Sequence, residues 1–548
     1  MNNLSGELTA NLVDIEMRTV RYGRLAWQNG VISAIEVLGE ERPEACYLSP
    51  GLIDAHVHIE SSMLTPAEFG RQAVCHGTIA TVSDPHEIAN VLGIEGVRFM
   101  LESAQASPCK IFYGAPSCVP ATPFETAGAR IELADIAALF DEPRVVALSE
   151  MMNFPGVLNG DPEVGAKLDL ARERGYPIDG HAPGLLGEAA RRYAGAGIST
   201  DHECFSLEEA RDKIAAGMMV QIREGSAARN FEALHSLITE TPEQVMLCSD
   251  DKHPDDLVAG HINRLAARAV AKGHDRFDVL RCACLNPVRH YHLPVGTLQL
   301  GDPMDAVLFA NLHEFQPIAT YVNGAKVAED GHCLVAGKAG QAINRFNARP
   351  IDPEALCIAD EGASMVRVIE AVDGELLTRQ RHMPPRSVNH MLEPDPERDM
   401  LLLMVLNRYQ PDAKPALAFI SGFGFQRGAI ASSVAHDSHN LIAVGCSREE
   451  IARAVNILVE SSGGIAVCDG ESVQSLPLPI AGLMSQEPAA MVGQRYADLD
   501  HAARALGSRL RAPYMTLSFM ALLVIPALKL SDKGLFDGDQ FAFVPLAV

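Results

Sequence analysis

Apolar and polar positions follow one repeating pattern between Gly51 and about residue 290. Short β-rich apolar runs recur roughly every thirty residues there, and helical patterns fill the intervals between them. We count eight such runs, the number of parallel strands that closes a (β/α)8 TIM barrel. The pattern therefore predicts an α/β fold with a barrel over residues 51–290. The runs are LIDAHVHIE, TIATVSDPHE, KIFYGAPS, RVVALSEMM, YPIDGHAPG, GISTDHECF, MMVQIREGS and QVMLCSDDKH.

Two further β-rich segments flank this region. Residues 11–50 alternate apolar and polar positions, and residues 291–349 are β-rich with glycine-containing turns. We expect residues 1–50 and 291–349 to pair into one small, sandwich-like composite β domain. Beyond residue 350 strands and helices alternate again, and the prolines of IDPEAL and HMPPRS favour a boundary near there. This predicts a C-terminal α+β domain over residues 350–548.

Composition narrows the classes of partner. The 548 residues include 45 basic and 70 acidic side chains, a net charge of −25 that repels nucleic acids and anionic membranes. The longest apolar candidate, residues 515–528, is too short to span a bilayer and contains Pro526, so we interpret it as a buried core element. No secretory signal precedes the first strand, and twelve cysteines without a CxxC suit a reducing compartment. We expect a cytoplasmic protein.

The first barrel strand carries two histidines at a spacing of two. In LIDAHVHIE, Asp54, His56 and His58 share one face of a strand, so both imidazoles can reach a common ion. An isolated HxH is more often structural or incidental than metal-binding. Here it ends the first of eight strands, at the edge where the catalytic face of a barrel lies. That position favours the metal-binding interpretation.

Four further candidate ligands end later strands: Glu150, His181, His202 and Asp250. Either histidine alone is compatible with a satisfied core residue, and Asp250 with a helix N-cap in SDDKHPDDL. Together with His56 and His58 they suffice for two metal ions about 3.5 to 4 Å apart that activate water. We therefore predict a metal-dependent hydrolase, with Asp250 as the general base and then the acid.

Several long strings resemble one known family. PGLIDAHVHIESSMLTP, SDPHEIANVLG, IDGHAPGL, IREGSAARN, SVAHDSHNLIAVG and LPLPIAGLMS are similar to the bacterial adenine deaminase family of the amidohydrolase superfamily, in the same order and over nearly the whole chain. The resemblance implies hydrolysis of adenine to hypoxanthine and ammonia, in purine salvage. It also implies a binuclear site, with manganese or iron as the working metal. Histidine and carboxylate ligands by themselves suit manganese, iron and zinc alike.

The resemblance assigns a role to each candidate ligand. It makes His56 and His58 ligands of the first metal, and His181 and His202 ligands of the second. Glu150 becomes the bridge, in the place where relatives that open cyclic amides carry a lysine. Asp250 becomes both a ligand and the proton shuttle.

A purine substrate gives the weaker motifs candidate roles. His86 and Glu87 in SDPHEI end the second strand, where they can protonate or bind a ring nitrogen, although DPHE is also a good turn and helix start. Arg223 and Glu224 in QIREGS can read the polar edge of the base; their alternative is an exposed ion pair of little value. His436 and His439 in AHDSHN belong to a lid over the site or to a polar loop that stabilises its own domain.

Two other functions remain open at this stage. The first is an amidohydrolase of the dihydroorotase or hydantoinase type, which acts on a cyclic amide and would normally show a lysine at position 150. The second is a non-catalytic assembly protein on a barrel that has lost ligands, and here all six are present. Neither alternative involves nucleic acid or a membrane. A homodimer is the default assembly, because twofold oligomers are the commonest.

Overall fold

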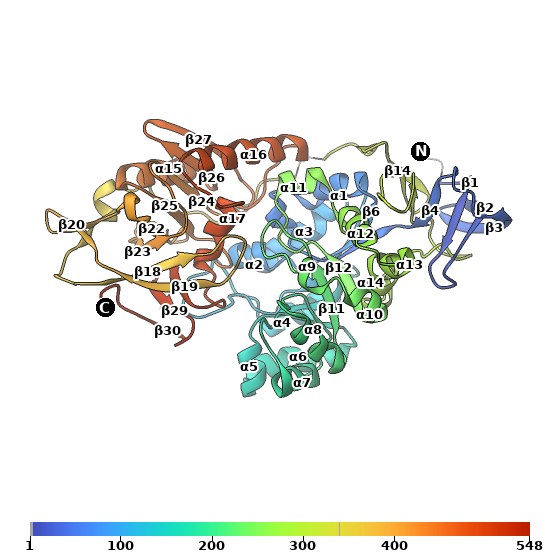
Figure 1. The fold of residues 1–548 in the computed structure, drawn as a ribbon, viewed down its shortest axis with the longest axis horizontal. Coiled ribbons are helices and arrows are strands. Elements are labelled where there is room, and N and C mark those ends of the chain that lie inside the picture. Colours follow the sequence, from blue (N-terminus) through green and yellow to red (C-terminus); the bar gives the residue numbers. More distant parts are fainter. Residues whose placement is uncertain (1–3, 339) are drawn as a thin grey trace.

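The molecule is elongated, with a sheet at each end and a helix-rich unit between them (Figure 1). The computed structural model describes residues 4–338 and 340–548. A flanking sheet near the N-terminus and the C-terminal elements lie at opposite ends of the view. Residues 51–290, here called the α/β unit, lie between them, and residues 350–548 are called the C-terminal unit.

The α/β unit contains eight parallel strands, one in each predicted run. Hydrogen bonding divides them into a five-stranded and a three-stranded sheet. Ser199 N donates to Ile178 O at 2.8 Å where the two sheets meet, and Asp250 N donates to His56 O at 2.9 Å at the opposite edges. The parallel sheet is therefore strongly curled. Its strands are β5 (Leu52–Val57), β6 (Thr78–Ser83), β7 (Lys110–Ala115), β8 (Val145–Met151), β9 (Ile178–Gly180), β10 (Thr200–Asp201), β11 (Met219–Arg223) and β12 (Val245–Cys248).

Helices follow the strands, and most of them bury one face. Local sequence sets where they begin: the Thr65 side chain accepts from Glu68 N at 3.4 Å at the start of α1, and Ser206 accepts from Glu209 N at 3.2 Å at the start of α8. The helices are α1 (Pro66–Cys75), α2 (His86–Leu92), α3 (Ile94–Ala104), α4 (Leu133–Leu139), α5 (Phe154–Asn159), α6 (Pro162–Arg174), α7 (Gly187–Gly195), α8 (Leu207–Ala215), α9 (Phe231–Leu234), α10 (Leu237–Glu240), α11 (Pro254–Ala259), α12 (Ile262–Ala271), α13 (Arg276–Leu280) and α14 (Asn286–His290).

The two segments that flank the α/β unit join in one eight-stranded sheet. Its order is β16-β15-β14-β13-β4-β1-β2-β3, so the antiparallel pair β13 and β4 connects the two segments. Trp27, the only tryptophan in the sequence, donates from Nε1 to Gly324 O at 3.1 Å across this join. The strands are β1 (Gly6–Asp14), β2 (Thr19–Gln28), β3 (Val31–Glu40), β4 (Tyr47–Pro50), β13 (Ala306–Phe309), β14 (Pro317–Val322), β15 (Ala325–Glu329) and β16 (His332–Cys333).

The C-terminal unit is built on a second eight-stranded sheet, of order β19-β18-β23-β22-β25-β24-β26-β27. Helix α15 (Arg448–Glu460) packs on this sheet, and α16 (Ala489–Ala505) packs against α11 of the α/β unit. One continuous apolar core contains residues of both units, among them Ile53 and Ile430. The strands are β18 (Val366–Ala371), β19 (Thr378–Met383), β22 (Leu401–Leu406), β23 (Ala416–Ser421), β24 (Ala429–Ser432), β25 (Leu441–Gly445), β26 (Gly464–Asp469) and β27 (Ser472–Pro477).

Two small sheets and one short helix complete the C-terminal unit. Helix α17 (Pro513–Ser518) begins the apolar segment 515–528, which is largely buried, as the sequence predicts. Among the described residues, no helix has the length and apolar character needed to cross a membrane. The small sheets contain β17 (Ile358–Ala359), β20 (Arg386–Val388) and β21 (Met391–Glu393), and β28 (Leu528–Ser531), β29 (Gly534–Asp537) and β30 (Ala542–Phe543).

Candidate active site

Two imidazoles from the first strand face each other at the carboxyl end of the α/β unit. The Nε2 atoms of His56 and His58 lie 3.3 Å apart, and both side chains are buried. Asp250, which follows β12, places its Oδ1 3.7 Å from His56 Nε2 and 3.2 Å from His58 Nε2. Its backbone φ of 53° lies in the left-handed region, which aspartate tolerates better than most residues. Three potential ligand atoms thus converge on one point.

Glu150 lies between these three residues and a second pair of histidines, His181 and His202. Its Oε2 is 2.6 Å from His181 Nδ1 and 3.2 Å from His202 Nε2, while its Oε1 is 3.3 Å from His58 Nε2. The carboxylate at the end of β8 therefore contacts histidines from the ends of both sheets. One carboxylate thus contacts both groups of potential ligands.

The donor set fits divalent cations. Ligand atoms of His56, His58 and Asp250 lie within 4.8 Å of one another, and so do those of His56, Glu150 and His202. Burying this many ionisable groups together is costly unless cations are bound. Imidazole nitrogens with carboxylate oxygens suit manganese, iron or zinc. The cluster is a divalent metal site.

The protein biases the charge of two of these groups, Glu150 and His56, toward the form that can bind a metal. Burial alone would raise the pKa of Glu150, but His181 and His202 hold it well below its usual range. Burial lowers the pKa of His56, and the nearby His202 and His58 lower it further. Glu150 is therefore ionised and His56 neutral, the forms in which both can act as metal ligands.

An arginine orients the carboxylate at the end of β12. Arg223, which ends β11 and is buried, donates to Asp250 Oδ2 and also to Glu203 Oε2 at 2.9 Å. Glu203 Oε1 lies 3.8 Å from His181 Nδ1 and 3.7 Å from His202 Nε2. Arg223 thereby fixes one oxygen of Asp250 and leaves the other directed at the histidines.

Asp54 has a supporting role instead of joining the ligands. Although it shares a strand face with His56 and His58, it accepts from Ser249 N at 2.9 Å and pairs with His261 Nε2 at 2.8 Å. These contacts tie β5 to the end of β12 and to the start of α12 below the cluster. Asp54 thus holds the strand that carries the two histidines.

Two histidines of the C-terminal unit contact the start of helix α2 beside the cluster. Helix α2 begins at His86, whose Nδ1 lies 3.4 Å from Glu150 Oε1. The next residue, Glu87, accepts from His436 Nδ1 at 2.6 Å and from His439 Nε2. The loop AHDSHN therefore lies over the site and is held there through Glu87.

A small cavity of about 30 Å³ lies at the centre of these groups. It has room for only a few water molecules. Predicted residues that line it are His58, His86, Glu87, Glu150, His181, His202, Arg223, Asp250 and His436. His56 contacts the same cluster at its edge, and His439 lies behind Glu87.

The structure does not bring Glu224 into this cavity. Its side chain points outward and accepts from Arg268 Nη1 at 2.7 Å. The prediction missed seven lining residues. Glu203 and Asp251 directly follow predicted ligands, and Asp437 directly follows His436 in the AHDSHN string, so a signal was available for these three. The others have no signal in the sequence: Met152, Leu376, Phe519 and Leu522.

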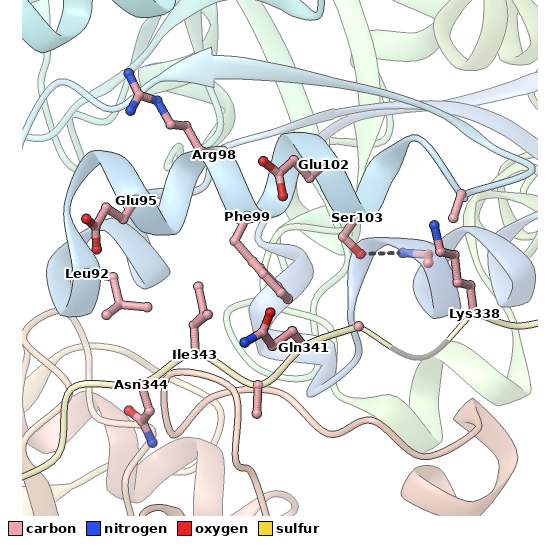
Figure 2. Close-up of a pocket in the computed structure, with 14 residues that line it drawn as sticks. Leu92, Glu95, Arg98, Phe99, Glu102, Ser103, Lys338, Gln341, Ile343 and Asn344 are labelled. Carbon is pink, nitrogen blue, oxygen red and sulfur yellow. Dashed lines mark hydrogen bonds between the residues drawn. The ribbon is translucent and has the colours of Figure 1, made fainter.

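A much larger cavity lies elsewhere in the described part of the molecule. It has a volume of about 760 Å³ and lies between α3 and the segment around Asn344 (Figure 2). Phe99 points across it toward Gln341. No histidine or cysteine is among its described lining residues, so we do not assign the metal chemistry to it.

The curled parallel sheet and its buried histidine–carboxylate cluster define an amidohydrolase-type, metal-dependent hydrolase. Consistent with this class, the amidohydrolase family matches residues 47–327, more than half of the chain. The adenine deaminase C-terminal domain matches residues 375–542. The adenine deaminases of Salinibacter ruber and Methanosarcina mazei are 52% and 50% identical to this chain, and each alignment covers 98% of both proteins. The chain belongs to the adenine deaminase family.

A further relative and one solved structure are also similar to this chain. An adenine deaminase of Borreliella burgdorferi is 43% identical over 98% of this chain and 99% of its own length. Among solved structures, a β-aspartyl dipeptidase of Fervidobacterium islandicum is 14% identical, with a TM-score of 0.45 over 62% of this chain and 99% of that one.

Proposed function

We propose that this chain hydrolyses adenine to hypoxanthine and ammonia, as part of purine salvage in the cytoplasm. The observation that carries the proposal is the near-complete alignment with adenine deaminases, together with the intact cluster of six candidate ligands. The reaction adds the oxygen of water at C6 of the purine and releases the amino group as ammonia.

The cluster would hold two divalent ions, and manganese is the metal we propose, with iron and zinc as alternatives. Bound cations of this kind lower the pKa of water and polarise the atom under attack. His56 and His58 would hold the first ion, His181 and His202 the second, and Glu150 both. Asp250 would complete the first group.

Asp250 is the residue we assign to proton transfer. Burial opposes its charge, but Arg223 and the nearby histidines hold its pKa well below its usual range, so it is ionised. It would accept a proton from the attacking water and pass it to the departing amino group. Arg223 would keep it oriented throughout.

His86 and Glu87 lie where the purine ring nitrogens would bind. His86 would donate a proton or hydrogen bond to a ring nitrogen beside C6, and Glu87 would orient the ring edge. His436 lines the same cavity, and His439 supports Glu87 from behind. The contact of Glu87 with both histidines supports a binding role for the AHDSHN loop.

Ammonia release from adenine by the manganese-loaded protein tests this proposal. We expect turnover of adenine, with little or none of adenosine, cytosine or dihydroorotate. Glu150→Gln should abolish turnover, while Glu224→Gln serves as the matched control because Glu224 lies outside the cavity. Ring opening of dihydroorotate without ammonia release from adenine would overturn the substrate and retain the metal site.

The alternatives from the sequence are not favoured. A hydrolase of cyclic amides is disfavoured by Glu150 and by relatives that are adenine deaminases over the full length. A non-catalytic assembly protein would be expected to lack part of the cluster, and its metal content would be low.

We also infer that the eight strands of residues 51–290 close into a complete (β/α)8 barrel. The backbone hydrogen bond from Asp250 N to His56 O supports this closure. The three domains would keep the boundaries expected from the sequence. A homodimer is the assembly we propose, and light scattering after gel filtration would test it.

A further inference from the structure

The cavity at the metal cluster is too small for the proposed substrate. Its volume of about 30 Å³ holds a few water molecules and excludes a fused purine ring system. Some part of the wall must therefore move when substrate binds. The inference below rests on the proposed function and identifies that part.

The wall from the α/β unit is not free to move. Its side chains are buried and joined by short contacts, such as Glu150 with His181 at 2.6 Å and Glu87 with His436 at 2.6 Å. In the C-terminal unit, Phe519 and Leu522, which follow α17, are 2% and 6% exposed and belong to the main apolar core. Displacing any of these groups would disrupt several interactions at once.

Leu376 is 4% exposed and belongs to the same apolar core, but unlike Phe519 and Leu522 it lies on the loop of a hairpin. Strands β18 and β19 pair up to Ala371 and Thr378, and residues 372–377 connect them. Gly374 in this loop has φ 77°, a conformation that favours glycine. The loop contacts the α/β unit through one backbone hydrogen bond, from Ala228 N to Gly374 O at 3.2 Å. Within the C-terminal unit, Asp373 of the loop also accepts from Arg511 N at 2.9 Å and from Arg511 Nε at 3.0 Å. Movement of the loop away from the α/β unit therefore breaks one backbone hydrogen bond to that unit.

Two larger cavities lie on the outer side of this loop. One of about 390 Å³ shares Leu376 and Arg223 with the cavity at the metal cluster. The next, of about 450 Å³, shares Gly374, Ala228 and Arg229 with the first. Arg229 is exposed, so the series leads from the surface to the metal cluster. Leu376 lies between the cavity of about 390 Å³ and the cavity at the metal cluster.

Lys529 holds Leu376 in place between these cavities. Its fully buried ammonium group donates to Leu376 O at 2.7 Å and to Phe519 O at 2.9 Å. It therefore ties the loop to the fixed segment that carries Phe519. Burying a charged ammonium group is unfavourable even when two carbonyls accept its hydrogen bonds. Burial accordingly lowers the pKa of Lys529 to about 7. Lys529 is a positioning residue, because it acts through the backbone of Leu376.

We propose that residues 372–377 form the gate of the active site, that adenine enters along the cavities beside Ala228 and Gly374, and that Leu376 closes over the ring and sets the size of base accepted. Lys529 fixes the closed position. An apolar side chain over a planar ring favours adenine and excludes purines with a bulky substituent.

The experiment compares Leu376→Ala and Leu376→Trp with Leu300→Trp as the control, since Leu300 is an exposed leucine near the flanking sheet. We expect Leu376→Ala to lower the preference for adenine over N6-methyladenine and adenosine by about tenfold or more. Leu376→Trp should lower kcat/KM for adenine by a similar factor and weaken hypoxanthine binding. Unchanged selectivity and unchanged hypoxanthine affinity in both variants would overturn the gate.

A second measurement uses the wild-type protein, in case the variants fold poorly. Hydrogen exchange of residues 372–377 should slow when hypoxanthine binds, and Lys529→Met should raise KM more than it lowers kcat. Identical exchange with and without hypoxanthine would overturn the proposal. Absence of ammonia release by the wild type would instead contradict the proposed function, so the two failures are distinguishable.

Discussion

The two walls of the site cavity are built in different ways. Apart from Met152, the wall from the α/β unit consists of buried charged and imidazole side chains that follow the strands and contact one another. The wall from the C-terminal unit combines the AHDSHN loop with three apolar residues, Leu376, Phe519 and Leu522. This difference indicates that the first wall supplies the residues for the reaction, whereas the second controls which substrate enters the site.

The largest effect is expected on the charged wall. Asp250→Asn should lower kcat/KM for adenine by about 1000-fold or more, equivalent to about 4 kcal/mol of transition-state free energy. The amide retains the shape of the side chain but cannot accept the proton. Steady-state kinetics with metal analysis would measure it, and activity within about tenfold of wild type would contradict the assignment.

The contact between the two walls should matter for stability. Glu87→Gln removes the carboxylate that His436 and His439 share, leaving buried imidazoles without their partner. We expect the free energy of unfolding to fall by about 3 kcal/mol. Urea denaturation would measure the change, and a loss below about 1 kcal/mol would show that the AHDSHN loop is held by other contacts.

Lys529, which holds Leu376 of the apolar wall, should make the free energy of unfolding depend on pH. Burial lowers the pKa of Lys529 from 10.5 to about 7, so between these values the unfolded chain binds one proton more than the folded chain. Wild-type stability should therefore rise with pH in this window, by about 1.4 kcal/mol per pH unit relative to Lys529→Met. If the free energies of unfolding of the two proteins changed in parallel from pH 7 to 10, the lowered pKa of buried Lys529 would be contradicted.

The smallest effect is expected outside both walls. Glu224→Gln removes an ion pair with Arg268, which is 37% exposed, so stability should change by less than about 1 kcal/mol. Activity toward adenine should remain within about twofold of wild type. A large loss of kcat/KM would return Glu224 to the substrate site.

Much of the charged wall could be predicted from the sequence. Strands buried on both faces leave continuous apolar runs, and all eight predicted runs contain a strand. The ends of parallel strands meet at one edge, so residues as distant as His56 and Asp250 could be placed together before any coordinates. The contact distances show that the six candidate ligands do converge.

The remaining features depend on geometry that a linear pattern does not contain. Arg223 and Glu224 are neighbours, but successive residues at a strand end point in opposite directions, so only Arg223 reaches the cavity. Asp54 shares a face with His56, yet it lies deeper and pairs with His261. Leu376 and Phe519 are ordinary apolar residues, and only the packing of the C-terminal unit on the α/β unit makes them part of the site.

The pairing of Glu87 with His436 also has a consequence for synthesis of the protein. The two residues are separated by 349 positions, so the ribosome makes the carboxylate long before its partner. At about 5 to 20 residues per second, the interval is roughly 20 to 70 s. In the part of this interval that follows synthesis of Asp250, the nascent chain carries all six candidate ligands without the cover that later encloses them, and a cation can load into an open site before the last strands emerge.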